Sequence, residues 1–251
     1  MSAVLAAGLV LGLGRSAVAD DQQAKAVLDK AVDALGGATK LSAAKAVTWK
    51  TKGKMRLGDN DNDNEFTSKI TAQGVDHFRQ ELEGDFNGTP VKGTTVVNGD
   101  KGWRDFNGQT SDLEGDQLSI QKRNVYLQLV AQMPQLLRGN GFKAESVEDQ
   151  KEGGKPAVAL KCTGPDGKEF RLYFDRESGL PVKMTATVAG RQGNEFAQET
   201  TYSNYKDFDG IKRATKVESK RNGQKFMESE VTDFKVLDKI DPKTFAEPKA
   251  D

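Results

Sequence analysis

A regular alternation of apolar and charged residues, beginning at Val47, is the feature that most constrains the fold. In the segment 47–57, VTWKTKGKMRL, every second residue from Val47 onward is apolar or small. The intervening positions after Trp49 are basic: Lys50, Lys52, Lys54 and Arg56. Because successive side chains of a strand point to opposite faces, this pattern predicts an antiparallel strand with one buried face and one solvated face.

The same two-residue period recurs along most of the chain. It is visible in the segments 65–72, 76–84, 94–108, 156–163, 168–175, 179–190, 194–208, 210–223 and 224–238. Turn motifs such as GPDGK, DRESGLP and RNGQK separate several of these segments. We therefore predict an antiparallel meander of roughly ten or eleven strands, a size at which open sheets tend to curl. No linker interrupts the pattern, which indicates a single domain.

Two segments follow a helical period instead. In residues 24–35, AKAVLDKAVDAL, apolar residues recur at helical spacing, and Gly36-Gly37 supplies the end of the helix. Residues 116–139 contain a second apolar helical face, which Pro134 breaks into two short helices. Both helices need a surface on which to bury their apolar faces. The expected fold is therefore mainly β, of the α+β type: an open, strongly curved antiparallel half-barrel with lid helices over its concave face.

The N-terminus has the features of a secretory signal peptide. An apolar run from Ala3 to Leu13 precedes Ala17-Val18-Ala19, a pattern typical of a cleavage site. We predict a signal peptide over 1–19 and one mature domain over 20–251, soluble and periplasmic or secreted. No basic residue precedes the apolar run, so either the signal is atypical or translation starts further upstream. The alternative is that this segment is a helix of the folded protein.

Composition argues against several classes of function. The chain carries 37 basic and 37 acidic residues, without the basic excess that a nucleic-acid partner favours. His77 is the only histidine and Cys162 the only cysteine. Zinc, haem and iron–sulfur sites need clusters of these residues, so we expect no metal, no cofactor and no intramolecular disulfide. The carboxylate pairs of KDFDG and DRES are better explained as turns.

One loop has the appearance of a calcium site. In the segment 58–66, GDNDNDNEF, three aspartates stand at alternate positions, as the first ligands of an EF-hand do. An EF-hand loop also needs Gly at its sixth position and Glu at its twelfth, where this chain has Asn64 and Ile70. The segment is therefore predicted to be the tip of the first hairpin of the sheet.

Taken in order, these motifs resemble a known family. The motifs are VTWKTKGKM (47–55), VVNGDKGW (96–103), YFDRESGLPVKM (173–184), TYSNYKDFDGIKRATKV (201–217) and IDPKTFAEP (240–248). Together with the N-terminal signal and helix, they are similar to the periplasmic lipoprotein-carrier superfamily, which is LolA/LolB-like and includes outer-membrane lipoprotein-sorting proteins. The resemblance covers about Asp20 to Pro248. Ala214 departs from it, since related sequences often have proline there, and the conserved lid arginine of the carriers has no clear counterpart.

The resemblance implies an incomplete β-barrel with helices as a lid over an apolar hollow. The implied function is that of an exported, soluble binding protein, not an enzyme, which holds a lipid or a lipoprotein acyl chain and takes part in outer-membrane lipoprotein sorting. The implied partners are lipids, acylated lipoproteins and membrane-bound donor or acceptor proteins, and a monomer is expected. Two alternatives stay open: an envelope sensor or scaffold with a protein ligand, and a carboxylate-based hydrolase.

Apolar residues on the inward strand faces and on the lid are the candidates for the ligand site. They are Trp49, Met55, Phe170, Leu172, Phe174, Leu180, Val182 and Met184 from the strands, with Leu129, Val130 and Met133 from the lid. Burial of apolar ligand surface contributes ~25 cal/mol per Å², so a preformed hollow suffices for acyl-chain binding. The alternative is that these side chains fill a closed core.

Overall fold

The computed structural model describes residues 17–56, 62–139, 141–190 and 193–249. In this part of the chain thirteen strands form one antiparallel sheet. The strands are β1 (Ala46–Met55), β2 (Asn64–Gln73), β3 (His77–Phe86), β4 (Thr89–Asn98), β5 (Lys101–Phe106), β6 (Gln109–Asp112), β7 (Lys143–Glu152), β8 (Lys155–Thr163), β9 (Glu169–Asp175), β10 (Pro181–Ala189), β11 (Glu195–Phe208), β12 (Ile211–Arg221) and β13 (Gln224–Leu237). The predicted fold class, an open curved antiparallel half-barrel, is confirmed.

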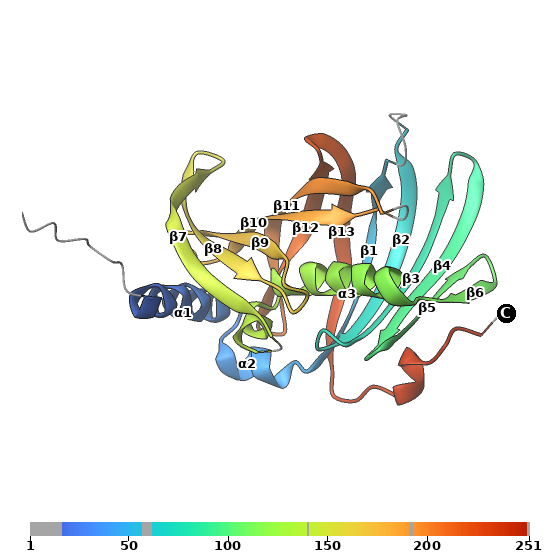
Figure 1. Cartoon of the computed structure of the whole chain (residues 1–251), viewed down its shortest axis with the longest axis horizontal. Helices are drawn as coiled ribbons and strands as arrows, with labels where there is room; N and C mark the ends of the chain where they lie inside the picture. Colours follow the sequence, from blue (N-terminus) through green and yellow to red (C-terminus); the bar gives the residue numbers. More distant parts are fainter. Residues whose placement is uncertain (1–16, 57–61, 140, 191–192, 250–251) are drawn as a thin grey trace, which may run out of the picture.

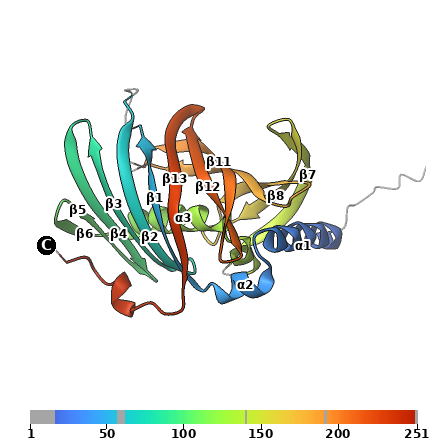
Figure 2. The same cartoon turned by 180° about the vertical axis from the view of Figure 1, so that it is seen from behind.

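The sheet is a meander with one non-sequential junction. Its order is β6-β5-β4-β3-β2-β1-β13-β12-β11-β10-β9-β8-β7, so the first and last strands of the chain pair at its centre. Trp49 of β1 lies opposite Phe234 of β13 and also opposite Ile70 of β2. The sheet curls strongly but does not close, and among the described strands β6 and β7 form its edges (Figure 1, Figure 2).

The structure has two more strands than the sequence pattern predicted. The additional strands are β6, which has four residues, and β7, which reads KAESVEDQKE. Neither strand alternates apolar with polar residues, because each is an edge strand paired on one side only. An edge strand carries charges that discourage pairing with another chain, which removes the periodic signal.

The helices are α1 (Ala17–Ala34), α2 (Ala38–Ala43) and α3 (Gly115–Val130), followed by the 3₁₀ helices η1 (Pro134–Arg138) and η2 (Pro242–Phe245). The break at Pro134 is as predicted. Helix α1 packs against β7 and η1, whereas α3 crosses the concave side of the sheet (Figure 1). The predicted signal peptide lies mostly outside the described residues, since α1 begins at Ala17, and its boundary stays a prediction.

A glycine joins the end of α1 to the sheet. Gly36 has a φ of 134°, and a Cβ at this position would clash with the carbonyl oxygen of Gly210 in the β11–β12 turn. The Lys212 amide donates to the Leu35 carbonyl at 2.9 Å, which fixes this approach. The Gly36-Gly37 pair therefore ends the helix, as predicted, and also permits its contact with the sheet.

The apolar face of α3 and the apolar face of α1 share one core with β8, β9 and β10. Val125 and Leu129 of α3 are fully buried there, as are Leu160 of β8 and Leu172 of β9. This part of the concave face, formed by β7–β10 under α1 and the apolar side of α3, is called the closed half below.

The first hairpin has the predicted pairing. Met55 lies opposite Asn64, and the Asn64 side-chain amide donates to the Met55 carbonyl at 3.0 Å. Beside it, Arg56 and Asp63 form an ion pair of 2.7 Å, and its hydrogen bond lowers the pKa of Asp63. The loop residues 57–61, which include Asp59 and Asp61 of the calcium-like motif, lie outside the described residues.

Candidate functional site

A cavity of about 310 Å³ lies between α3 and the concave face of the sheet. Its walls come from β1–β3 and β10–β13 on one side and from α3 on the other. We call this cavity the hollow. Ligand pockets usually measure ~300–1,000 Å³, so the hollow is at the lower end of that range.

Large apolar side chains in the hollow keep part of their surface accessible. They are Met55, Leu82, Val217, Phe226 and Met227, each only half-buried. Met55 and Met227 are directly opposite one another across β1 and β13. Methionine adapts its shape to irregular apolar partners, so this pair suits a flexible chain.

Helix α3 faces the hollow with carboxamides. Gln121, Asn124 and Gln128 lie on this side, and Gln132 follows just beyond the end of the helix. Their spacing of three or four residues places them in one stripe along the helix. Its opposite side carries the apolar residues that pack into the closed half. The sequence shows this polar stripe, but the analysis of apolar residues alone missed it.

The predicted ligand-site residues divide into three groups in the structure. Trp49, Met55 and Met184 line the hollow. Trp49 and Met184 also belong to the buried core, whereas the residues that are buried in it without lining the hollow are Leu129, Val130, Met133, Phe170, Leu172 and Phe174. Leu180 packs against the edge of that core, and Val182 is half-buried away from the hollow. Their roles in ligand binding stay predictions.

Arg213, which the sequence analysis did not single out, lines the hollow and is only 4% exposed. Its guanidinium carbon lies 4.4 Å from the centre of the Trp49 ring and 4.8 Å from that of Phe234. Such cation–π contacts contribute ~0.5–2 kcal/mol each, whereas burial of a charge costs several kcal/mol. The two rings therefore offset only part of the cost of burial.

Among the residues that the structure describes, no carboxylate pairs with the charge of Arg213. Its Nε is buried and has no hydrogen-bond acceptor in the described part of the chain. The titratable groups that interact with it are the Tyr202 and Tyr205 hydroxyls, which are uncharged at neutral pH, and not carboxylates. Burial lowers the pKa of Arg213 to about 10, so the side chain is still protonated at neutral pH.

A second arginine lies on the same wall. Arg221 is half-buried, and its guanidinium carbon lies 3.6 Å from the centre of the Phe226 ring. Its Nε donates to the Gln198 side-chain carbonyl at 3.1 Å, and burial lowers its pKa. Among the described residues that line the hollow there are thus two arginines and no Asp or Glu.

A second buried arginine, Arg123, has an acidic partner and further hydrogen-bond acceptors. Arg123 of α3 is 5% exposed and forms an ion pair of 3.1 Å with Asp166, in the β8–β9 turn. It also donates to the Thr187 carbonyl at 3.1 Å, to the Glu169 carbonyl at 3.0 Å and to the Tyr126 hydroxyl. This network belongs to the closed half.

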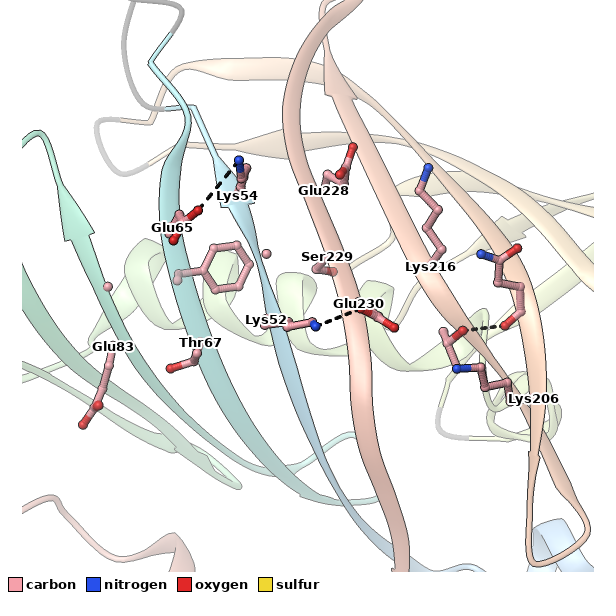
Figure 3. A pocket seen from close by; sticks show the side chains of 15 residues that line it. Lys52, Lys54, Glu65, Thr67, Glu83, Lys206, Lys216, Glu228, Ser229 and Glu230 are labelled. Carbon is pink, nitrogen blue, oxygen red and sulfur yellow. Dashed lines mark hydrogen bonds and ion pairs between the residues drawn. The ribbon is translucent and has the colours of Figure 1, made fainter.

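The outer face of the sheet carries a larger depression of about 950 Å³ (Figure 3). Its charged residues are Lys52, Lys54, Lys206, Lys216, Glu65, Glu83, Glu228 and Glu230, and their charges cancel. Lys52 pairs with Glu230 at 3.3 Å and Lys54 with Glu65 at 3.7 Å. These are solvated surface pairs, and α3 lies behind the strands that carry them. The hollow, not this outer groove, is the site where apolar surface and unpaired charge meet.

The other residues considered as catalytic or metal-binding candidates are His77, Cys162 and the turn carboxylates. Half-buried His77 lies against Phe245 of η2, with ring centres 5.5 Å apart. Burial raises the pKa of the Cys162 thiol to about 12, so it is not a nucleophile at neutral pH. The described residues contain no cluster of three His, Cys, Asp or Glu side chains that could hold a metal. The carboxylate of Asp175 accepts from the Ser178 amide and hydroxyl, which confirms its turn role.

Comparison with known proteins places this fold. No protein-family model and no curated protein sequence match the chain. A LolA-superfamily protein from Nitrosomonas europaea is structurally similar, with 13% identity, a TM-score of 0.59, and coverage of 89% of this chain and 97% of that one. A putative outer-membrane lipoprotein-sorting domain from Vibrio parahaemolyticus has 12% identity, a TM-score of 0.52 and coverage of 87% and 97%.

A DUF1329-family protein from Desulfovibrio piger is also similar, with 11% identity, a TM-score of 0.56, and coverage of 89% of this chain and 97% of that one. At such low identities the likeness concerns the fold alone. The predicted resemblance to the lipoprotein-carrier superfamily is therefore confirmed at the level of the fold. In the described part of the chain, no helix is both long and apolar enough to cross a membrane.

Proposed function

We propose that the protein is an exported binding protein that holds one acyl chain of a lipid or lipoprotein in the hollow. The observation that carries this proposal is the set of half-exposed apolar side chains around a cavity of about 310 Å³ under α3. In a closed core these side chains would be covered. Here they are available to a ligand, and the structural likeness to a lipoprotein-sorting domain supports the same reading.

Binding would be driven by burial of the acyl chain, at ~0.8 kcal/mol for each methylene group removed from water. The small volume favours a single chain over a multi-chain lipid. Release requires either movement of α3, which covers the hollow, or an acceptor that buries the chain better. Delivery to a membrane-bound acceptor, with a role in outer-membrane lipoprotein sorting, is the finer form of this proposal.

Native mass spectrometry of the protein from a membrane-containing host tests the proposal, together with titration of a fluorescent fatty acid. Val217→Trp places a large side chain into the hollow from β12 and should weaken probe binding by about tenfold or more, equivalent to ~1.4 kcal/mol. Val236→Trp is the matched control, because Val236 is 39% exposed and lies outside the lining of the hollow. Absence of both co-purified lipid and probe binding would refute the acyl-chain function.

A further inference from the structure

The wall of the hollow contains a buried cation that no carboxylate of the described residues accompanies. Arg213 is buried in its wall, stacked between Trp49 and Phe234, with an Nε that has no acceptor in the described part of the chain. The charge of this guanidinium is removed from bulk solvent, and no carboxylate of the described residues compensates it.

Two other buried or largely buried cations of the described residues, outside the hollow, do have a carboxylate partner. Arg123, buried to the same degree in the closed half, has a carboxylate, two backbone carbonyls and a hydroxyl as partners. Lys183, also largely buried, pairs with Glu152 at 2.5 Å. The fold therefore pairs its buried cations where no ligand is expected.

The surroundings of Arg213 are suited to an anion. Arg221 adds a second cation on β12, where a stacked ring and the Gln198 carbonyl orient it. Carboxamides of α3 face the same space, and Gln132 is held by the Ala214 amide, which donates to its Oε1 at 3.1 Å. Hydroxyls and carboxamides donate hydrogen bonds to an anion without adding negative charge.

We propose that the hollow binds an anionic amphiphile, with its carboxylate or phosphate group at Arg213 and its apolar tail along the methionine side of the cavity. This inference rests on the proposed acyl-chain function and adds the charge of the ligand to it. Arg213 is the principal contact because its planar fork matches both carboxylate and phosphate oxygens. Arg221 provides a second, more exposed contact.

The test is displacement of a fluorescent fatty acid by four ligands with the same tail, all below their micellar concentrations. They are laurate, dodecyl phosphate, dodecanol and dodecyltrimethylammonium. The parent protein should bind the two anions about tenfold or more tighter than dodecanol, as expected for charge-assisted hydrogen bonds, and the cation most weakly. Comparison of laurate with dodecyl phosphate shows which head group the site prefers.

Substitution then locates the charge recognition. Arg213→Met should abolish the preference for anions, measured as the ratio of laurate affinity to dodecanol affinity within the same variant, and Arg213→Lys should retain part of that ratio. Arg221→Met, at a half-buried position, provides a second variant that is less demanding for folding. Lys52→Met, an exposed lysine of the outer groove, should behave like the parent.

The outcomes separate the two proposals. Equal binding of laurate and dodecanol by the parent, or an anion preference that survives in both Arg213→Met and Arg221→Met, would overturn the charge selection and leave the acyl-chain function standing. Failure of the fluorescent fatty acid and of every dodecyl ligand to bind, with no co-purified lipid, would overturn both. If inorganic phosphate bound in an Arg213-dependent way while no dodecyl ligand did, the amphiphile would be excluded and a small anion would take its place.

Discussion

The two sides of α3 face two regions, the closed half and the hollow, which differ in how tightly apolar side chains are packed and in how buried charges are paired. In the closed half, apolar side chains of α3 share a core with those of β8–β10, and the fully buried cation, Arg123, pairs with Asp166 and donates to two backbone carbonyls. In the hollow, carboxamides of the same helix face half-exposed apolar residues, and Arg213 has no carboxylate. Arg123 and Arg213 are thus buried to a similar degree, but only the charge of Arg123 is balanced by a carboxylate.

This difference suggests a division of roles within one sheet, in which the closed half stabilises the fold and the hollow is available for a ligand. Tight packing in the closed half and the hydrogen-bond network of Arg123 hold α3 in place. The hollow on the other side of the helix keeps apolar surface and a charge available, which costs stability in the absence of a ligand. The comparison therefore predicts that equivalent substitutions in the two regions have different consequences.

The largest effect is expected for Arg123→Met. It leaves Asp166 without its cation and removes the donor to two carbonyl groups, so the free energy of unfolding should fall by about 3 kcal/mol. Urea denaturation followed by circular dichroism measures this change. Lys122→Met is the control on the same helix, since its pair with Asp100 is solvated, and should leave the midpoint unchanged. A midpoint for Arg123→Met equal to that of the parent would show that the closed half does not depend on this network.

Arg213→Met should have a much smaller effect on stability. It removes a buried charge without orphaning a carboxylate, and methionine retains contact with Trp49 and Phe234. The free energy of unfolding without ligand should therefore stay within about 1 kcal/mol of the parent value, with an increase favoured. The same urea experiment on ligand-free protein checks it. If Arg213→Met lowered the free energy of unfolding as much as Arg123→Met does, the fold itself would stabilise the charge of Arg213. The proposed difference between the two regions would then be wrong.

The sequence predicted the sheet because the sheet has one buried and one solvated face. In β1 the alternation is nearly complete from Trp49 onward, so its faces could be assigned without a structure. The edge strands β6 and β7 lack this signal, since pairing on one side removes the need for it. Strand existence was predictable wherever burial imposed a period.

The site was less predictable, because periodicity identifies an inward face but not what covers it. Phe170 and Trp49 both point inward and both are buried in the core, yet only Trp49 borders the hollow. For Arg213 a signal did exist. It shares the parity of Ile211 and Val217 in β12, so alternation alone places this basic residue on the inward face. Arg213 was not predicted because only apolar residues were considered as candidates for the ligand site.

Thiol labelling provides a further test of the closed half. Cys162 is fully buried on β8, and burial raises the pKa of its thiol to about 12. At pH 8 the folded protein should resist iodoacetamide for as long as the closed half stays packed, whereas the urea-unfolded chain should react fully. Mass spectrometry of the intact protein measures the modified fraction. Arg123→Met should accelerate labelling and Arg213→Met should not. Equal acceleration by both would show that the two regions open together.

The smallest effect concerns methionine oxidation, which compares the same side chain in both environments. Met55 and Met227 are half-buried in the wall of the hollow, whereas Met133 lies in the closed core. Dilute hydrogen peroxide should therefore convert Met55 and Met227 to sulfoxides before Met133, as quantified by peptide mass spectrometry. Laurate should slow oxidation of the first two and leave Met133 unaffected, since the acyl tail is expected to cover only the hollow. Protection of Met133, or none at Met55 and Met227, would place the tail elsewhere and remove the distinction between the two sides of α3 as far as ligand binding is concerned.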